Sequence, residues 1–179
     1  MNRPILRFGA LSAAILVGVN VITLLLLGVP DAESYGVGEI IGYATIIVSL
    51  IPIVFALEYY RDREGDGRLG FWRGVGIGAG VAALPSVVFA IYNLIYVRWI
   101  DPDFSENYLQ YATDRARESM TSDEFHQYAA QLEAQQSMLS DPLFQMGIMF
   151  LTVFLLGLLI SVISALVLQR KTARADSGT

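Results

Sequence analysis

Long apolar runs, separated by charge-rich stretches, dominate the pattern of this chain. The first run begins after Arg7 and continues without a charged residue to Pro30. A helix needs about 20 such residues to cross the hydrocarbon layer of a bilayer. The pattern therefore predicts an all-α protein, a four-helix transmembrane bundle. The expected spans cover residues of about 8–29, 40–57, 74–97 and 143–168.

Features within the first three runs qualify this prediction. Arg3 and Arg7 before the first run resemble the start of a signal peptide, but the run is longer than a signal core and no A-x-A cleavage site follows. Pro52 and Pro85 lie inside the second and third runs. A proline removes one backbone hydrogen bond, which neighbours must compensate in a membrane. We therefore expect a first span that is retained and a second span that bends at Pro52.

The composition assigns the whole chain to the membrane class. Of its residues, 54% are hydrophobic and 16% are charged, with a mean hydropathy of +0.51. Soluble domains carry about 25% charged residues, so the apolar surplus here has to face lipid. Residues 1–179 are therefore expected to form a single integral membrane domain in contact with the lipid bilayer.

Lysine and arginine are unevenly distributed between the segments that connect the runs. Positive residues close to a span are retained on the cytoplasmic side of the membrane. Nine of the twelve lie on one predicted side, namely Arg3, Arg7, Arg61, Arg63, Arg68, Arg73, Arg170, Lys171 and Arg174. The other three, Arg98, Arg115 and Arg117, lie between the third and fourth runs. We therefore expect both the N-terminus and the C-terminus to be cytoplasmic.

The segment between the third and fourth runs is the one sizeable polar part, with nine acidic residues against three basic ones. Asp101-Pro102 resembles a helix cap followed by proline at the first helical position, and Thr121 to Glu124 has the spacing of a capping box. We expect an extracytoplasmic helical hairpin over about 101–140. Its second helix carries an apolar stripe that needs cover, formed by Phe125, Tyr128, Ala129, Leu132 and Leu139. Asp141-Pro142 predicts a capped start of the last span.

Small residues recur at helical spacing in the third and fourth spans. Such files let two helix backbones approach closely, which drives association in lipid. They favour packing of the third span against the fourth. Two alternatives remain: the same pattern also mediates dimerisation, and Ala10, Ala14 and Gly18 give the first span a similar surface for packing against the third. The files consist of Gly70, Gly74 and Gly78, of Gly76 and Gly80, and of Gly157 and Ser161.

A candidate polar path involves Glu39, Tyr43 and Asn93. A carboxylate that borders an apolar span is costly unless it finds water or a partner, so it can mark an ion or proton pathway. The alternative is that Glu39 lies in interfacial water and anchors the start of its helix through the helix dipole.

Familiar catalytic and binding patterns do not occur in the sequence. Cysteine is absent, which excludes disulfides, thiolate catalysis and cysteine-ligated metals. His126 is the single histidine and has no second histidine or cysteine at ligand spacing. There is no phosphate-binding loop, no G-x-S-x-G elbow and no basic cluster for nucleic acid. We therefore expect no enzymatic activity, no cofactor, no metal and no nucleic acid partner.

Short motifs spread along the chain resemble one family in the same order. They include Gly38 to Tyr43, Tyr60-Arg61-Asp62, Asp141 to Phe144, and Gly157 to Ala165 followed by Arg170-Lys171. In this order they resemble a family of uncharacterised bacterial membrane proteins, domain of unknown function 4199. Asp141 departs from the asparagine expected at that position. The resemblance implies a four-helix protein of the bacterial inner membrane and implies no activity.

Two functions are compatible with these features of the sequence. The first is an interaction or accessory subunit whose acidic hairpin meets a protein partner at the membrane surface. The alternative is a small transporter or channel that acts as a homo-oligomer and uses Glu39, Tyr43 and Asn93.

Overall fold

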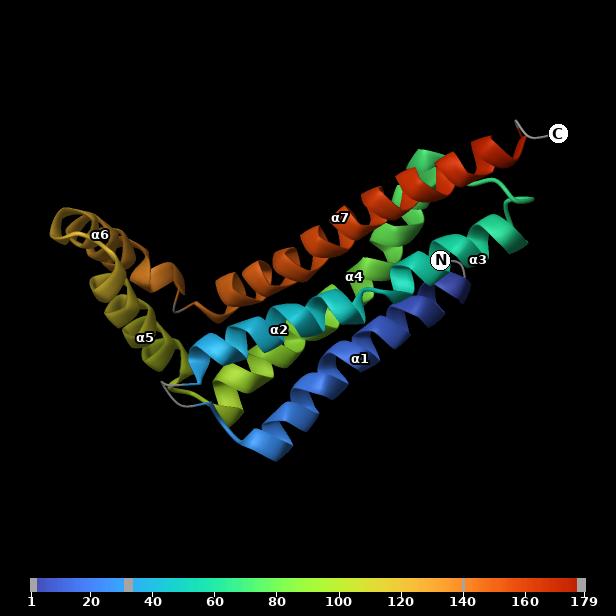
Figure 1. The fold of residues 1–179 in the computed structure, drawn as a ribbon. Coiled ribbons are helices and arrows are strands. Elements are labelled where there is room, and N and C mark those ends of the chain that lie inside the picture. Colours follow the sequence, from blue (N-terminus) through green and yellow to red (C-terminus); the bar gives the residue numbers. More distant parts are fainter. Residues whose placement is uncertain (1–2, 31–33, 140, 177–179) are drawn as a thin grey trace.

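The structure is a computed structural model that describes residues 3–30, 34–139 and 141–176. Within these ranges all regular elements are helices and none is a strand, which confirms the expected all-α fold (Figure 1). In chain order the elements are α1 (Arg3–Leu27), α2 (Tyr35–Ser49), α3 (Pro52–Arg63), α4 (Phe71–Ile95), the π-helical turn η1 (Tyr96–Ile100), α5 (Phe104–Ser119), α6 (Ser122–Leu139) and α7 (Pro142–Asp176).

Four segments are long and apolar enough to cross a membrane, which confirms the number of expected spans. They cover Arg3–Leu27, Tyr35–Arg63, Phe71–Ile100 and Pro142–Gln169, with lengths of 25, 29, 30 and 28 residues. The second span combines α2 with α3, and the third combines α4 with η1. Each length exceeds the roughly 20 residues that a bilayer requires.

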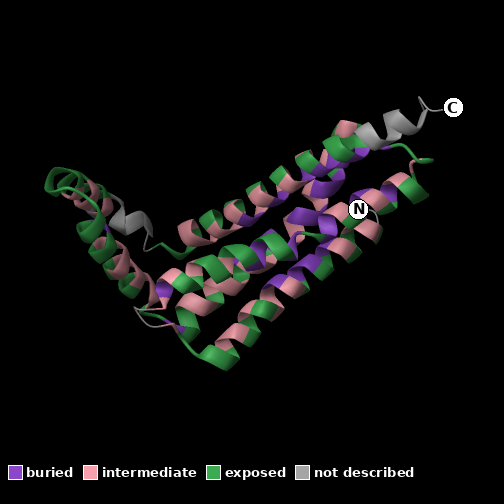
Figure 2. Ribbon diagram, viewed as in Figure 1, coloured by how far each residue is buried: buried purple, intermediate pink, exposed green. Residues whose placement is uncertain are grey.

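Exposed residues occur along every helix of the bundle (Figure 2), and many of them are large and apolar. Leu25, Leu26 and Leu27 at the end of α1 are between 74% and 78% exposed. Ser49, Ser86 and Ser161 are fully buried instead, and each hydroxyl donates a hydrogen bond to a carbonyl of its own helix. This distribution fits a protein whose surroundings are lipid, because lipid solvates leucine but not hydroxyl groups.

The two helix prolines have different effects. Pro52 divides the second span, since α2 ends at Ser49 and α3 begins at Pro52. Pro85 lies inside α4, which stays continuous. Proline at 85 leaves the Val81 carbonyl without its usual donor. Gly9 of α1 lies against this carbonyl, and a Cβ added at Gly9 would be 3.1 Å from the Val81 oxygen.

The bundle is arranged around α4. This helix packs along α7 and α1 and also contacts α3. The two ends of the chain lie at one end of the bundle, and the α5–α6 hairpin lies at the other (Figure 1). The fully buried core consists mainly of Leu50, Ile53, Leu57, Val81 and Val153.

Three helix starts were expected from the sequence, and the structure confirms two of them. The Thr121 N–H donates to Glu124 Oε2 at 3.0 Å, which is the reciprocal half of a capping box at the start of α6. The Leu143 N–H donates to Asp141 Oδ1 at 2.9 Å at the start of α7. The prediction at Asp101-Pro102 is wrong, because α5 begins at Phe104 after Asp103. The π-helical turn carries the third span to Ile100 and leaves Asp101 in a non-helical conformation.

Candidate functional site

Glu39 lies where the start of α2 contacts the α5–α6 hairpin. It lies one turn after Tyr35, the first residue of α2. The Tyr108 hydroxyl of α5 donates a hydrogen bond to Glu39 Oε1, and Arg115 Nη1 lies 3.9 Å from Glu39 Oε2. The carboxylate therefore has two partners on the hairpin. We call the group Tyr35, Glu39, Phe104, Tyr108, Tyr111 and Arg115 the hairpin joint.

Helical spacing places the α5 members of the joint on one face. Phe104, Tyr108, Tyr111 and Arg115 are separated by four, three and four residues, which brings them into one stripe along an α-helix. This stripe faces the start of α2. The local sequence of α5 therefore determines which side of the hairpin attaches to the bundle.

Aromatic rings pack around Tyr35 at the base of the hairpin. Its ring centroid lies 5.9, 5.8 and 5.5 Å from those of Phe104, Tyr108 and Tyr111. Tyr96 of η1 adds an edge-to-face contact with Phe104 at 5.6 Å. Each such pair contributes about 0.5–1.5 kcal/mol beyond its buried area. The rings thus join α2, η1 and α5, and Tyr35 is only 5% exposed.

The polar contacts of the joint differ in strength. The ion pair between Arg115 and Glu39 joins side chains that are 64% and 36% exposed, so water screens it and its contribution is below about 1 kcal/mol. Tyr108 is part-buried. Burial raises the pKa of its phenol, and the hydrogen bond to Glu39 raises it further. Tyr108 therefore stays protonated and donates to the carboxylate.

Gly36 lets the hairpin approach the start of α2. A Cβ at this position would lie 2.9 Å from the Tyr111 hydroxyl oxygen. A larger side chain at residue 36 would therefore displace Tyr111 from the joint. The Arg115 guanidinium donates to the same hydroxyl at 2.9 Å, so Tyr111 links α5 internally as well.

The three residues of the expected polar path are not arranged as one line. Glu39 turns toward the hairpin, and Tyr43 is 57% exposed one turn further along α2. Asn93 belongs to α4, which does not pack closely against α2 in the described ranges. Among the described residues Asn93 forms no hydrogen bond with Glu39 or Tyr43.

Glycines of the third span lie against α7. A Cβ at Gly74 would lie 2.9 Å from Ala165 Cβ, and a Cβ at Gly78 would meet Ser161 Cβ at 2.5 Å and its hydroxyl oxygen more closely still. Gly157 of α7 has the reciprocal position, with Ala82 Cβ at 2.5 Å. These residues bring the two backbones close together.

The remaining glycines of the two files have other surroundings. A Cβ at Gly80 would lie 3.2 Å from Ile5 on α1, so this glycine faces the first span. Gly70 and Gly76 have no heavy atom within 4 Å of an added Cβ. The file of Gly76 and Gly80 therefore does not form one interface.

The sequence does not identify the joint partners of Glu39, which are Tyr35, Tyr108, Tyr111 and Arg115. The available signal was the aromatic stripe of α5, but it identifies only a face and not its partner. No group of three or more metal-ligating side chains occurs within the described ranges, so we assign no metal site there.

Comparison with known proteins identifies a family. A family model described as protein of unknown function (DUF4199) matches residues 7–170 and confirms the resemblance read from the sequence. Neither a curated protein nor a solved structure matches the chain.

Proposed function

The chain belongs to DUF4199, a family of proteins of unknown function, and we propose from its own contacts that it is an accessory or assembly subunit of the bacterial inner membrane. In this proposal the α5–α6 hairpin meets a partner protein at the extracytoplasmic surface. The subunit has no enzymatic role. The observation that carries the proposal is the joint between Glu39 and Tyr108, which fixes the hairpin on the bundle.

A fixed attachment suits a docking element. The ring cluster around Tyr35 and the hydrogen bond to Glu39 hold the base of α5 at a set position relative to α2. From there the hairpin extends away from the membrane bundle (Figure 1). Presenting two helices rigidly lowers the ordering cost of binding a partner.

The surface of the hairpin is acidic because its carboxylates outnumber its two arginines, and both arginines also make contacts within the protein. Arg115 contacts Glu39 and Tyr111, and the Arg117 guanidinium carbon lies 5.2 Å from the centroid of the Phe125 ring. The exposed carboxylates include those of Glu106, Asp114, Glu118 and Asp123. Charge complementarity therefore favours a partner with a basic surface.

The apolar stripe of α6 is partly covered within the hairpin. Phe125 is half-buried beneath Arg117, and Tyr128, Ala129 and Leu132 are also half-buried. The side chain of Leu139 lies outside the described residues. The stripe is thus not a free apolar face, and the proposal places the partner on the charged side of the hairpin.

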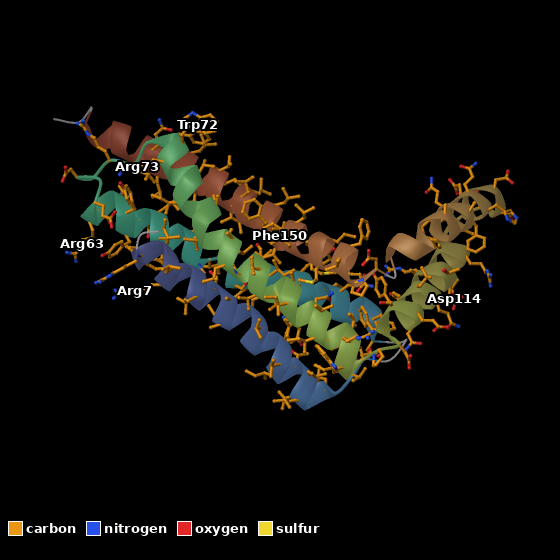
Figure 3. The ribbon with its side chains drawn as sticks, turned by 180° about the vertical axis from the view of Figure 1, so that it is seen from behind. Arg7, Arg63, Trp72, Arg73, Asp114 and Phe150 are labelled. Carbon is orange, nitrogen blue, oxygen red and sulfur yellow. The ribbon has the colours of Figure 1, made fainter. Side chains whose placement is uncertain are left out.

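The proposed orientation has cytoplasmic termini. Figure 3 shows Arg7, Arg63, Trp72 and Arg73 at one end of the bundle and Asp114 on the hairpin at the other. The Arg73 guanidinium carbon also lies 4.8 Å above the Tyr60 ring. An excess of arginine close to the ends of the spans is typical of the cytoplasmic face. The alternative of a transporter or channel oligomer has less support, because Glu39 is bound to the hairpin and Asn93 lies apart from it.

Site-specific crosslinking tests the docking surface. We expect a photoreactive residue in place of Gln127, which is exposed on α6, to crosslink in intact membranes to a protein with a basic extracytoplasmic segment. The substitutions Glu118→Lys and Asp123→Lys together should lower the yield at least about tenfold, which corresponds to about 1.4 kcal/mol.

The matched control reverses carboxylates at the opposite end of the bundle. Glu64→Lys with Asp66→Lys changes the charge equally and should leave the crosslink unchanged. Crosslinks solely to a second copy of this chain would contradict the proposal and favour the oligomeric transporter, and a yield indifferent to the hairpin charges would also contradict it.

A further inference from the structure

Asp101 is a buried carboxylate at the point where the third span leaves the membrane. It follows η1 directly and precedes α5 by two residues. The residue is 7% exposed, and its Oδ2 atom is buried without a hydrogen-bond partner within the described part of the chain. An ionised carboxylate is costly in such a position, because its Oδ2 atom meets no donor and is shielded from bulk water.

The π-helical turn fixes Asp101 in this position. The Asp101 N–H donates to the Tyr96 carbonyl at 2.9 Å, five residues back, which closes the wide turn. Turns of this type are rare and are frequent at functional sites. The turn also carries Tyr96, whose ring packs on Phe104 in the ring cluster of the hairpin joint. Asp101 is thus connected through backbone and side chains to the base of the hairpin.

The surroundings of the Asp101 carboxyl favour its neutral form. Burial raises its pKa, and the negative charge of nearby Asp103 raises it further. A hydrogen bond from the Asp103 N–H opposes both effects. The titratable groups that face the carboxyl are Asp103 before α5 and Tyr96 of η1. Neither supplies a positive charge, so protonation is the simplest way to remove the charge of the buried carboxyl.

We propose that the Asp101 carboxyl is a proton-binding site, and that proton uptake from the extracytoplasmic side tightens the attachment of the hairpin to the bundle. The protonated carboxyl is neutral, so its burial at the base of α5 costs less desolvation free energy than burial of the carboxylate. Its ionised form is better solvated by water, which requires the junction to open. The proposal adds a regulation to the proposed function, and its consequence for partner binding rests on that function.

The sign of the pH effect follows from proton linkage. The folded junction binds its proton more tightly than an open chain, in which an aspartate has a pKa of about 3.9. The free-energy cost of burying the ionised carboxylate is therefore absent below a pH of about 3.9, and it is fully present above the higher pKa of the folded state. Glu124 acts in the opposite direction, because the Thr121 N–H lowers its pKa and the stabilisation is lost as pH falls.

Trp99 offers a local reporter for this titration. The chain has two tryptophans, and Trp72→Phe leaves Trp99 alone, 71% exposed and two residues before Asp101. In detergent or nanodiscs, the emission of Trp99 should change with a midpoint above 3.9. Asp101→Asn should hold the emission at its acidic value at all pH values. Infrared difference spectra should show a carboxyl band with the same midpoint, and this band should be lost in the same variant.

Asp103→Asn provides an independent variant. Removing the negative charge of Asp103 should lower the midpoint while the transition persists. A midpoint at or below about 3.9 in the parent protein contradicts the proposal, as does a transition that survives Asp101→Asn. If Asp101→Asn does not fold, an unchanged midpoint in Asp103→Asn overturns the proposal. These measurements use the protein alone, so a negative result would not contradict the proposed docking function. Conversely, the absence of a partner protein would not contradict the proton-binding site.

Discussion

Replacing Gly78 with alanine is expected to destabilise the membrane bundle by about 1–3 kcal/mol, the usual cost of overpacking a close contact. A Cβ at this position would lie 2.5 Å from Ser161 Cβ and still closer to its hydroxyl. Ser161 is fully buried and donates to the Gly157 carbonyl, so it cannot move away without losing that bond. α4 and α7 must therefore separate. The measurement is reversible unfolding of the purified protein in mixed detergent micelles.

Gly76→Ala is the matched control for this prediction. Gly76 lies on the same helix, two residues from Gly78, and an added Cβ meets nothing within 4 Å. Alanine should be neutral or stabilising there, because it has a higher helix propensity than glycine. Equal stabilities of the two variants would show that α4 and α7 do not approach as described.

The second large effect is expected at the hairpin joint. Tyr108→Phe removes the hydrogen bond to Glu39 and leaves the ring contacts with Tyr35 and Phe104 in place. Hydrogen bonds to charged groups contribute about 1.5–3 kcal/mol, so local opening of the hairpin should increase at least about tenfold. Amide hydrogen exchange along α5 measures this opening directly, while exchange in α4 and α7 should not change.

Tyr111→Phe tests whether the effect belongs to the Glu39 contact. This variant loses the hydrogen bond from Arg115, which is exposed, so we expect less than about 1 kcal/mol. Glu39→Ala combined with Tyr108→Phe should be no more open than Glu39→Ala alone, because Glu39→Ala already removes the acceptor of the Tyr108 hydroxyl. Additive effects would mean that Glu39 and Tyr108 act independently and would contradict the joint.

The membrane spans were predictable because the length of an apolar run is a local property of the sequence. The starts of α6 and α7 were predictable for the same reason, since Glu124 and Asp141 lie within three residues of the groups they cap. The break at Pro52 was predictable as well, whereas the continuity of α4 through Pro85 was not, although both prolines lie in apolar runs. Whether a helix continues through a proline depends on neighbouring helices, such as α1 beside the Val81 carbonyl.

The candidate site shows a sharper limit. Glu39 attracts attention from the sequence because it borders an apolar span, but its partner Tyr108 is 69 residues away. No local period connects them. Spacing along the helix likewise does not reveal which partner a glycine faces. It groups Gly76 with Gly80, but in the structure Gly76 has open space beside it and Gly80 packs against α1. The Asp101-Pro102 pair predicts a helix cap, whereas the burial of Asp101 depends on the π-helical turn, which has no sequence signature.

The central claim is that four helices cross the membrane and place the hairpin on the side opposite both termini. Because the chain lacks cysteine, single cysteines introduced by Glu64→Cys and Asp123→Cys can be labelled without background. Both positions are exposed and both lose one carboxylate. With an impermeant maleimide on intact cells, we predict labelling at 123 and none at 64 until the membrane is permeabilised. Labelling of both positions from the outside, or of 64 alone, would contradict the account.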